Sequence, residues 1–532
     1  MRTVNRLMRR FRNDQRGNLA VIFAIACVPL ISAIGCAIDY TEAVRIKSKL
    51  QSAADAAAVA AISQQSSGWL AASLMTTNGE VTAGENDARN VFNGNITNFL
   101  SLFNGQTVTA TVTKTGANLT SVVSFSANVP VTFMKVVGFT QLTVTGSSSA
   151  SSSLPLYLDF YLTLDVSGSM GLPSTTAEQA RLNGVNPDNF GQYPTGCTLA
   201  CHFAVQNVCT DTGSNAQKYP TNSYCMGYAF TRVSQTALNN LLNVRATKQG
   251  VHNSTALGFP DSMVPGLPGS LNTDPTYGIP AASSCPTDGT DACIQLRADA
   301  VGYAVNQLFA TANSKAVVAN QFRIGLYPFI QTLYAYFPLT SAINGSPTNS
   351  STINYAAANL ASQLDTNTNS NLGSGGTHID TALSQLNTLI ASVGNGSATN
   401  NTLPYVFLVT DGAQDPQTKS LNTSGGWAGS NHATVIASGS SSPCQPLKNR
   451  GIKVSVLYIP YVPIANPNPN FAGDEDDAAN NNIPNIPPSL QSCASPADSS
   501  GSYFYTANTP ADIQAALNAM FNHALVTAHI TN

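Results

Sequence analysis

The sequence predicts a mixed α/β protein in which a transmembrane helix and a small α+β domain precede a larger domain with a parallel sheet flanked by helices. Three observations support this fold class: an uncharged run of 22 residues near the N-terminus, alternation of Val, Thr and Phe with polar residues between positions 106 and 145, and apolar strands that alternate with helical segments after residue 155. With 532 residues, the chain is long enough for two or three folded units.

The N-terminus has the charge pattern of a membrane anchor. Residues 1–16 contain six arginines and one aspartate, although the whole chain has a formal net charge of -3, and this imbalance argues against an overall nucleic-acid binder. The run GNLAVIFAIACVPLISAIGCAI, residues 17–38, is long enough to cross a bilayer as a helix. A cleaved secretory signal is the alternative, but Asp39-Tyr40-Thr41-Glu42 stands where a small-residue cleavage site should lie. We therefore expect a cytoplasmic tail at 1–16, a transmembrane helix at 17–38, and export of everything after residue 39.

The cysteines agree with export. Cys27 and Cys36 lie inside the expected span, and the other eight cysteines follow it. An even number of cysteines in an exported region predicts up to four disulfides in an oxidising compartment. The sequence leaves the pairing open, although two pairs are the simplest: Cys285 with Cys293, and Cys444 with Cys493.

After the span, residues 39–145 continue the helix and then change character. The Ala-rich segment without Gly or Pro extends the helix to about residue 63, and it carries a stripe made of Tyr40, Val44, Leu50, Ala54, Ala57 and Ala61. We interpret the stripe as packing onto the next domain; a partner helix is the alternative. A short helix near 86–103 and the alternating segments QTVTATVTK, TSVVSFSA, VPVTFMKV and TQLTVTG predict a small antiparallel sheet. This is the outline of a pilin-like subunit.

Residues 146–154 are rich in Ser and are expected to form a flexible linker to a domain at 155–532. In that domain we expect strands at 156–165, 322–329, 331–338, 403–410, 452–459 and 502–506, and helices at 294–312, 378–392 and 509–526. The runs YVFLVT and VSVLYI are typical of parallel strands that are buried on both faces. Two insertions interrupt the pattern: a cysteine-rich one at 172–293 and a Pro- and Asn-rich loop at 466–488, which is expected to be exposed and mobile.

Hard oxygen donors follow the first strand of the domain. DVSGS places Asp165, Ser167 and Ser169 directly after a buried strand, and side chains of this kind suit a small divalent cation. Asp411 follows a second strand in LVTDG, and sites in parallel sheets lie at the carboxyl ends of strands. The alternative is that the serines cap a turn and the aspartates accept hydrogen bonds from backbone amides.

Together, DVSGS, GSGGTHID and LVTDG resemble the von Willebrand factor type A domain, a Rossmann-like fold, and its metal-ion-dependent adhesion site. The resemblance covers about residues 155–530. It implies that hydroxyls of Ser167, Ser169 and Thr377, with Asp165 and Asp411, hold an ion that is typically Mg²⁺ or another divalent cation. It also implies that an acidic side chain of a partner completes the coordination of the ion.

The N-terminal part resembles TadG-like proteins of the tight-adherence, or Flp, pilus assembly system. The motifs are RGNLAVIFA, IDY and LQSAADAAAVAA, and CQPLKNRGIKV, LQSCAS and YFYTA in the C-terminal part fit the same family. The resemblance implies a single-pass protein of the bacterial inner membrane with its C-terminal domains in the periplasm or at the cell surface. Its partners would be other pilus assembly components and an acidic group of a pilus or surface protein.

We therefore expect binding rather than catalysis. The sequence contains no GxSxG, no P-loop and no GxGxxG after a strand, and no general base stands out beyond the site carboxylates. The expected function is pilus assembly or adhesion through the metal site. The alternative is a structural envelope scaffold in which that site is vestigial or covered.

Overall fold

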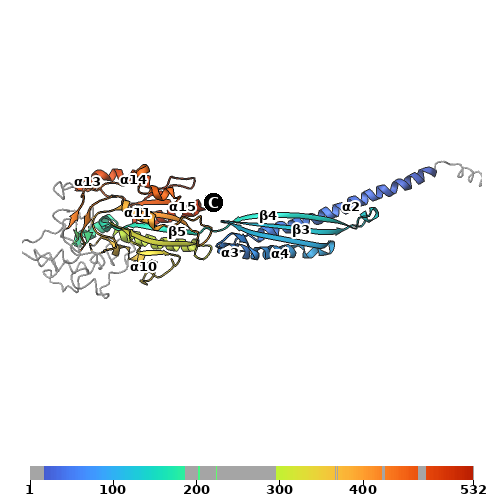
Figure 1. Cartoon of the computed structure of the whole chain (residues 1–532), viewed down its shortest axis with the longest axis horizontal. Coiled ribbons are helices and arrows are strands. Elements are labelled where there is room, and N and C mark those ends of the chain that lie inside the picture. The colour runs from blue at the N-terminus through green and yellow to red at the C-terminus, as the bar shows by residue number, and fades with distance from the viewer. Residues whose placement is uncertain are drawn as a thin grey trace, which may run out of the picture. The chain divides into compact units, whose positions relative to one another are not determined.

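The chain folds as two compact units, residues 1–155 and 156–532 (Figure 1). The computed structural model describes residues 17–185, 202–203, 223–224, 295–365, 367, 369–421, 426–464 and 475–530. The cytoplasmic tail predicted at 1–16 lies outside the described residues, as do the six cysteines of the insertion at 172–293.

Helix α2, Gly17–Ala60, is continuous, so the predicted extension of the apolar helix is confirmed. It includes Pro29, which membrane helices tolerate better than helices in water. Within the described residues, this is the one helix that is long and apolar enough to cross a membrane. Its large apolar side chains between Ile22 and Ile38 are exposed, with Phe23 at 69% and Ile25 at 70%.

The buried face of α2 differs from the predicted stripe. Leu50, Ala54, Ala57 and Ala61 are buried as predicted, whereas Tyr40 is 64% exposed and Val44 is 47% exposed. Six residues separate Val44 from Leu50, about one and two-thirds turns, so the two cannot share a face. The buried row instead reaches Leu50 from Asp39, Ala43 and Ile46. This face packs on the small sheet and on helix α4, which supports the local-packing interpretation.

The small unit pairs four antiparallel strands in the order β1-β2-β3-β4. Their bounds are Gly79–Glu80, Asn104–Thr115, Asn118–Pro130 and Gln141–Ser153, with helices α3 at Ser67–Leu74 and α4 at Thr82–Ile96 and the 3-10 helix η1 at Thr97–Leu102. The prediction of a strand at VPVTFMKV was wrong, because β3 ends at Pro130 and a short 3-10 helix, η2, follows at Met134–Val137.

The Ser-rich segment predicted as a linker is the second half of strand β4. Residues 146–153 pair with β3, for example Ser148 with Val123 and Ser152 with Leu119. Small polar side chains give no strand signal of their own, but backbone hydrogen bonds to a neighbouring strand do not depend on side-chain type. The boundary between the two units therefore falls after Pro155.

The large unit is built on a six-stranded sheet with the order β14-β13-β10-β5-β8-β9. The strands are β5 Leu158–Asp165, β8 Phe322–Phe329, β9 Phe337–Thr340, β10 Leu403–Thr410, β13 Lys453–Tyr458 and β14 Phe504–Thr506. All neighbouring pairs are parallel except β8 with β9. The predicted strand at 331–338 was wrong in its bounds: the strand here is β9, which is short, lies at the edge of the sheet and runs antiparallel to β8.

Helices cover both faces of the sheet. On one face lie α9, Arg297–Lys315, α10, Ile353–Ala358, and α15, Pro510–Ile530, where Phe521 packs 5.1 Å from Phe160 between ring centroids. On the other face lie α11, Ile379–Leu389, α12, Gln445–Asn449, and α14, Ile486–Cys493. The predicted mixed α/β fold with a doubly covered parallel sheet is therefore confirmed.

Much of the predicted loop at 466–488 is helical. Helix α13 covers Glu475–Asn482, the 3-10 helix η10 covers Ile483–Asn485, and α14 follows at once. Prolines fit here because they occupy the first turn of α14, where a backbone N–H has no partner within the helix. The predicted disulfide between Cys444 and Cys493 is confirmed, and it ties the end of α14 to the start of α12.

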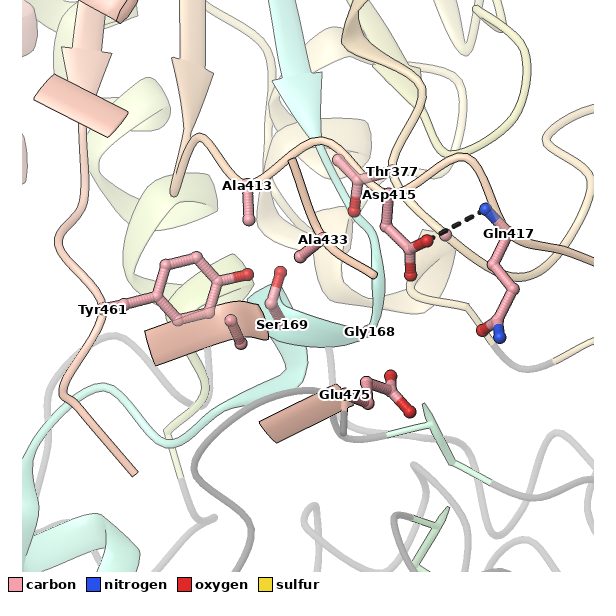
Figure 2. A pocket seen from close by; sticks show the side chains of 11 residues that line it. Gly168, Ser169, Thr377, Ala413, Asp415, Gln417, Ala433, Tyr461 and Glu475 are labelled. Atoms are coloured by element: carbon pink, nitrogen blue, oxygen red, sulfur yellow. Dashed lines mark hydrogen bonds between the residues drawn. The ribbon is translucent and has the colours of Figure 1, made fainter. Parts of the chain in front are cut away.

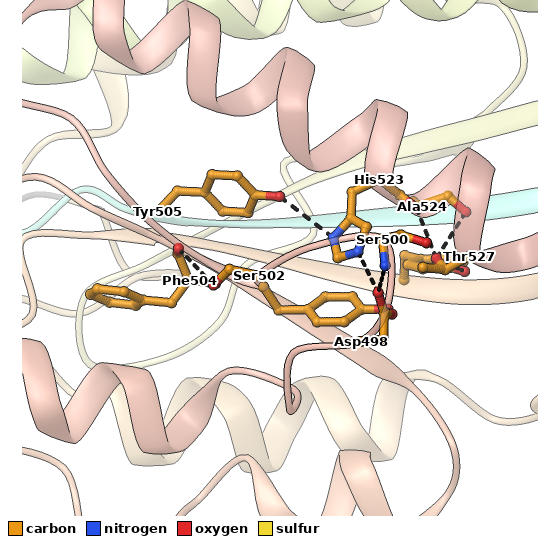
Figure 3. A network of polar contacts seen from close by, with 10 residues as sticks. Asp498, Ser500, Ser502, Phe504, Tyr505, His523, Ala524 and Thr527 are labelled. Atoms are coloured by element: carbon orange, nitrogen blue, oxygen red, sulfur yellow. Dashed lines mark hydrogen bonds and ion pairs between the residues drawn. The ribbon is translucent and has the colours of Figure 1, made fainter.

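A polar network fastens α15 to the segment before β14 (Figure 3). Nε2 of His523 lies 3.0 Å from Oδ1 of Asp498, and the hydroxyl of Tyr503 donates a hydrogen bond to Oδ2 of Asp498 over 2.8 Å. Burial alone would raise the pKa of Asp498, but these hydrogen bonds and one from Ser500 outweigh it and hold the pKa at about 2. Asp498 therefore contributes stability above the ordinary pKa of aspartate, and this contribution disappears as the pH falls towards 2.

Replacing Asp498 with asparagine is expected to remove this acid-dependent loss of folding stability. Asp498 is exposed, so the substitution should lower the free energy of unfolding near neutral pH by about 1 kcal/mol or less. Thermal unfolding of the variant and the wild type, measured between pH 2 and pH 7, should converge at the acid end. A constant difference across that range would contradict the assignment.

Candidate metal and ligand site

Two neighbouring parallel strands position the aspartates of the predicted site. Asp165 is the last residue of β5, and Asp411 follows Thr410, the last residue of β10. The strands pair in register, with Val409 opposite Leu164, so the residues that follow emerge side by side. Both aspartates are buried, with relative exposures of 1% and 0%. The structure thus brings Asp165 and Asp411 to one edge of the sheet.

The chain after β5 turns directly into the 3-10 helix η3, Gly168–Gly171. Ser167 N donates to Asp165 Oδ1 over 2.9 Å, and the hydroxyl oxygens of Ser167 and Ser169 lie 3.1 Å apart. The first contact is a hydrogen bond from a backbone amide to an aspartate, which the alternative interpretation expected. The second brings two buried hydroxyls together beside the carboxylate. The two roles are therefore compatible in this turn.

Thr410 is a site residue that sequence reasoning missed. Its hydroxyl donates to Asp165 Oδ2 over 2.6 Å and accepts from Gly412 N over 2.9 Å. It therefore joins the ends of β5 and β10 and orients the Asp165 carboxylate. Its position immediately before Asp411 in LVTDG could have indicated that Thr410 belongs to the site.

Thr377 reaches the same region from a glycine-rich loop. Its backbone exchanges hydrogen bonds with Asp415, over 2.9 Å and 3.0 Å. Gly376, just before it, has φ +69°, and a Cβ there would collide with the carbonyl oxygens of Asp415 and Gln417. Only glycine allows this close approach, which sets Thr377 at the pocket.

Ser169 and Thr377 line one pocket (Figure 2). Tyr461 and Glu475, the first residue of α13, face the same space. Burial, together with the neighbouring charges of Asp415 and Asp476, raises the pKa of Glu475 to about 8. Glu475 therefore carries little negative charge at neutral pH, and a cation in the pocket would favour its ionised form.

Burial also perturbs the two aspartates at the base of the site. It raises the pKa of Asp411, and the nearby charge of Asp165 adds to that rise, while Arg297 and a hydrogen bond from Ser169 oppose it. Burial likewise raises the pKa of Asp165. Two buried carboxylates this close together are short of compensating positive charge.

The donor set fits a small hard cation. Asp411 Oδ1 is buried and has no hydrogen-bond partner in the described part of the chain. The hydroxyls of Ser167, Ser169 and Thr377 are further oxygen donors at this edge. Among the described residues, no group of three or more His, Cys, Asp or Glu side chains is placed to hold a metal, so an ion here would depend on hydroxyls and water.

Arg297 is a second residue that sequence reasoning missed. Its Nη1 lies 3.5 Å from Asp411 Oδ2, and its Nη2 donates to Pro460 O over 3.0 Å. The guanidinium also lies over the ring of Tyr461, 5.6 Å from its centroid. Arg297 is only 8% exposed, so it is a fixed internal countercharge beside the predicted ion position. Nothing in the local sequence marks it, since it simply begins helix α9.

The cysteine-rich insertion leaves and re-enters the domain beside this site. Arg297 N donates to Leu172 O over 2.8 Å, and Ser174 N donates to Gln295 O over 2.9 Å. Gln295 N also donates to the buried carboxylate of Glu178 over 2.7 Å. The two ends of the insertion therefore form a short stem that carries Arg297.

Comparison with solved structures gives three examples of similarity. Proximal thread matrix protein 1 from the mussel byssus is 18% identical, with 43% of each chain covered and a TM-score of 0.24, so this chain spans less than half of that protein. The PilB minor pilin from Streptococcus sanguinis is 9% identical, with 79% of this chain and 78% of that chain covered and a TM-score of 0.29. The von Willebrand domain of the type V pili tip protein Mfa5 from Porphyromonas gingivalis is 14% identical, with 44% and 89% covered and a TM-score of 0.25.

All three TM-scores are too low to support an inference about this chain. No curated protein matches the chain significantly. One family model does match: residues 17–72 are similar to the family described as putative Flp pilus-assembly TadE/G-like.

Proposed function

We propose that this protein is a membrane-anchored component of tight-adherence pilus assembly or adhesion. In this proposal the large unit binds an acidic group of a pilus or surface partner through Mg²⁺, or another divalent cation, held by Asp165, Ser167, Ser169, Thr377 and Asp411. The observation that carries the proposal is the buried, unpartnered Oδ1 of Asp411 beside clustered hydroxyls at one edge of a parallel sheet.

The chemistry of the pocket explains why the cation matters. When bound, the ion supplies a Lewis-acidic centre with few direct carboxylate ligands, so it keeps positive charge for an incoming carboxylate. Without it, an acidic ligand would approach Asp165 and Asp411, two buried carboxylates at the same edge of the sheet. The hydroxyls of Ser167, Ser169 and Thr377 would be further ligands of the ion. Binding of the partner should therefore require the cation.

The proposed location follows from the N-terminal segment. Helix α2 provides the apolar span, and the arginines of residues 1–16 would keep the N-terminus in the cytoplasm of a bacterial inner membrane. The large unit would then lie in the periplasm or at the cell surface, where the Cys444–Cys493 disulfide is stable. The TadE/G-like match at residues 17–72 supports the assignment to pili. We propose no catalytic step.

One observation favours the alternative of a structural scaffold. Arg297 already provides Asp411 with a positive partner, as expected of a site that no longer needs an ion. In that case the protein would act through its long helix and the small unit, and its binding to pili would be equal with and without divalent cations.

The test uses the full chain in detergent micelles and pili sheared from cells that express it. We expect the immobilised chain to retain pili in Mg²⁺, to release them in EDTA, and to retain them again when Mg²⁺ is restored. Retention that is equal in Mg²⁺ and EDTA would exclude the metal-dependent proposal and support the scaffold.

A further inference from the structure

The loop between β3 and β4 exposes a cluster of large apolar side chains. Phe133 is 42% exposed, Val136 75%, Val137 52% and Phe139 53%. These four residues, which we call the apolar loop, lie on and around the 3-10 helix η2. A contiguous apolar surface of this kind in a small domain usually marks a binding surface.

The apolar loop is attached to the apolar part of helix α2. Gly35, three residues before the end of the uncharged run, lies against Phe133, and a Cβ on Gly35 would come within 2.5 Å of the Phe133 Cβ. The apolar side chains of Ile31, Ile34 and Ile38 are also exposed at this level of the helix. The loop therefore extends an apolar surface that the helix already presents.

Asp39 fixes this arrangement at the end of the uncharged run. Its carboxylate accepts hydrogen bonds from three successive backbone N–H groups, those of Thr132, Phe133 and Met134, over 3.0, 2.8 and 2.7 Å. Asp39 is only 7% exposed. The acidic group nearest the uncharged run is thus shielded inside the protein, and the next one, Glu42, is partly exposed and pairs with Arg45.

Three further backbone N–H groups of the loop are also paired internally. Val136 N donates to Phe133 O, Gly138 N to Lys135 O, and Phe139 N to Met134 O, each over 3.1 Å. Internal pairing of backbone N–H groups is what an apolar medium requires, because water is not there to replace the bonds. Lys135, which is exposed, has a side chain long enough to reach the headgroup phosphates from such a position.

We propose that the apolar loop inserts into the outer surface of the bilayer that α2 spans, as a second membrane contact beside the helix. The proposal rests on the proposed anchoring of the protein by α2. Val136, Val137 and Phe139 would lie at the boundary between headgroups and acyl chains, with Lys135 among the phosphates. Two contacts fix the rotation and tilt of a helix better than one, so the loop would hold the small unit at a defined angle to the membrane.

The test places a tryptophan on the loop of the full chain in phospholipid vesicles that contain anionic lipid. Val136→Trp probes the apolar loop. Leu74→Trp is the matched control, because Leu74 is 64% exposed and lies near the β2–β3 turn, where Lys114 Nζ donates to Ala72 O and Met75 O. After subtraction of the wild-type signal of Trp69 and Trp427, lipids brominated near the headgroup should quench the added fluorescence of Val136→Trp at least about twofold more than that of Leu74→Trp.

Flotation of the vesicles separates failure of the loop from failure of the anchor. If the protein floats with the vesicles but neither Val136→Trp nor a second probe, Phe139→Trp, is quenched more than the control, the loop proposal is wrong and the anchor stands. A blue shift without quenching would assign the loop to another protein surface and also overturn the proposal. If the wild-type chain does not float, the anchor and the loop proposal both fail.

Discussion

Replacing Arg297 with methionine is expected to lower the free energy of unfolding of the metal-free large unit by about 3–5 kcal/mol, because the change leaves a buried charge without its partner. Arg297 Nη1 is the ion-pair partner of Asp411, whose side chain is fully buried. The same substitution should increase the affinity for Mg²⁺ by about tenfold or more. A neighbouring cationic side chain shifts the pKa of a carboxylate by about one to three units, and it should weaken the binding of a metal cation by a similar factor. Mg²⁺ should therefore restore most of the lost stability.

Thermal unfolding in EDTA and in Mg²⁺, together with calorimetric titration of Mg²⁺, measures both effects. Arg323→Met is the matched control, because Arg323 pairs with Asp159 at the opposite end of β5, over 2.6 Å. It should change stability without changing Mg²⁺ affinity. If Arg297→Met bound Mg²⁺ no more tightly than the wild type, Arg297 would not act as an internal competitor of the ion.

Replacing Asp165 with asparagine is expected to abolish stabilisation by Mg²⁺. In the wild type, an ion at 100 times its dissociation constant should add about 2.7 kcal/mol to the free energy of unfolding. The asparagine side chain still offers an oxygen that can accept the hydrogen bonds of Ser167 N or Thr410, but it carries no negative charge. The fold should therefore survive in EDTA while the response to Mg²⁺ is lost.

Asp159→Asn is the control for this experiment. Asp159 is a buried aspartate of the same strand, and it accepts hydrogen bonds from Arg323 and Thr402 at the end remote from the site. Its substitution should destabilise the unit but leave the Mg²⁺-dependent increase in melting temperature intact. A full response to Mg²⁺ in Asp165→Asn would show that the ion, if bound, lies elsewhere.

The central strands could be predicted closely from the sequence. The expected strands at 322–329 and 403–410 agree residue for residue with β8, Phe322–Phe329, and β10, Leu403–Thr410. Such strands are buried on both faces, so their apolar runs are long and end sharply at polar residues. The edge elements were not predicted as well, because β4 and β9 depend on pairing with a neighbour more than on their own composition.

The candidate site divides in the same way. The motif residues Asp165, Ser167, Ser169 and Asp411 could be located because they lie at or shortly after the end of an apolar strand, and parallel strands end at a common edge. The residues alone thus determined the long apolar helix, the doubly covered sheet and the edge that carries the oxygen donors. Only the tertiary structure decided that Arg297 contacts Asp411, 114 positions away, and that the loop after β3 lies against Gly35 of α2. Contacts of this kind depend on which faces pack together, and periodicity along one segment contains no information about its distant partner.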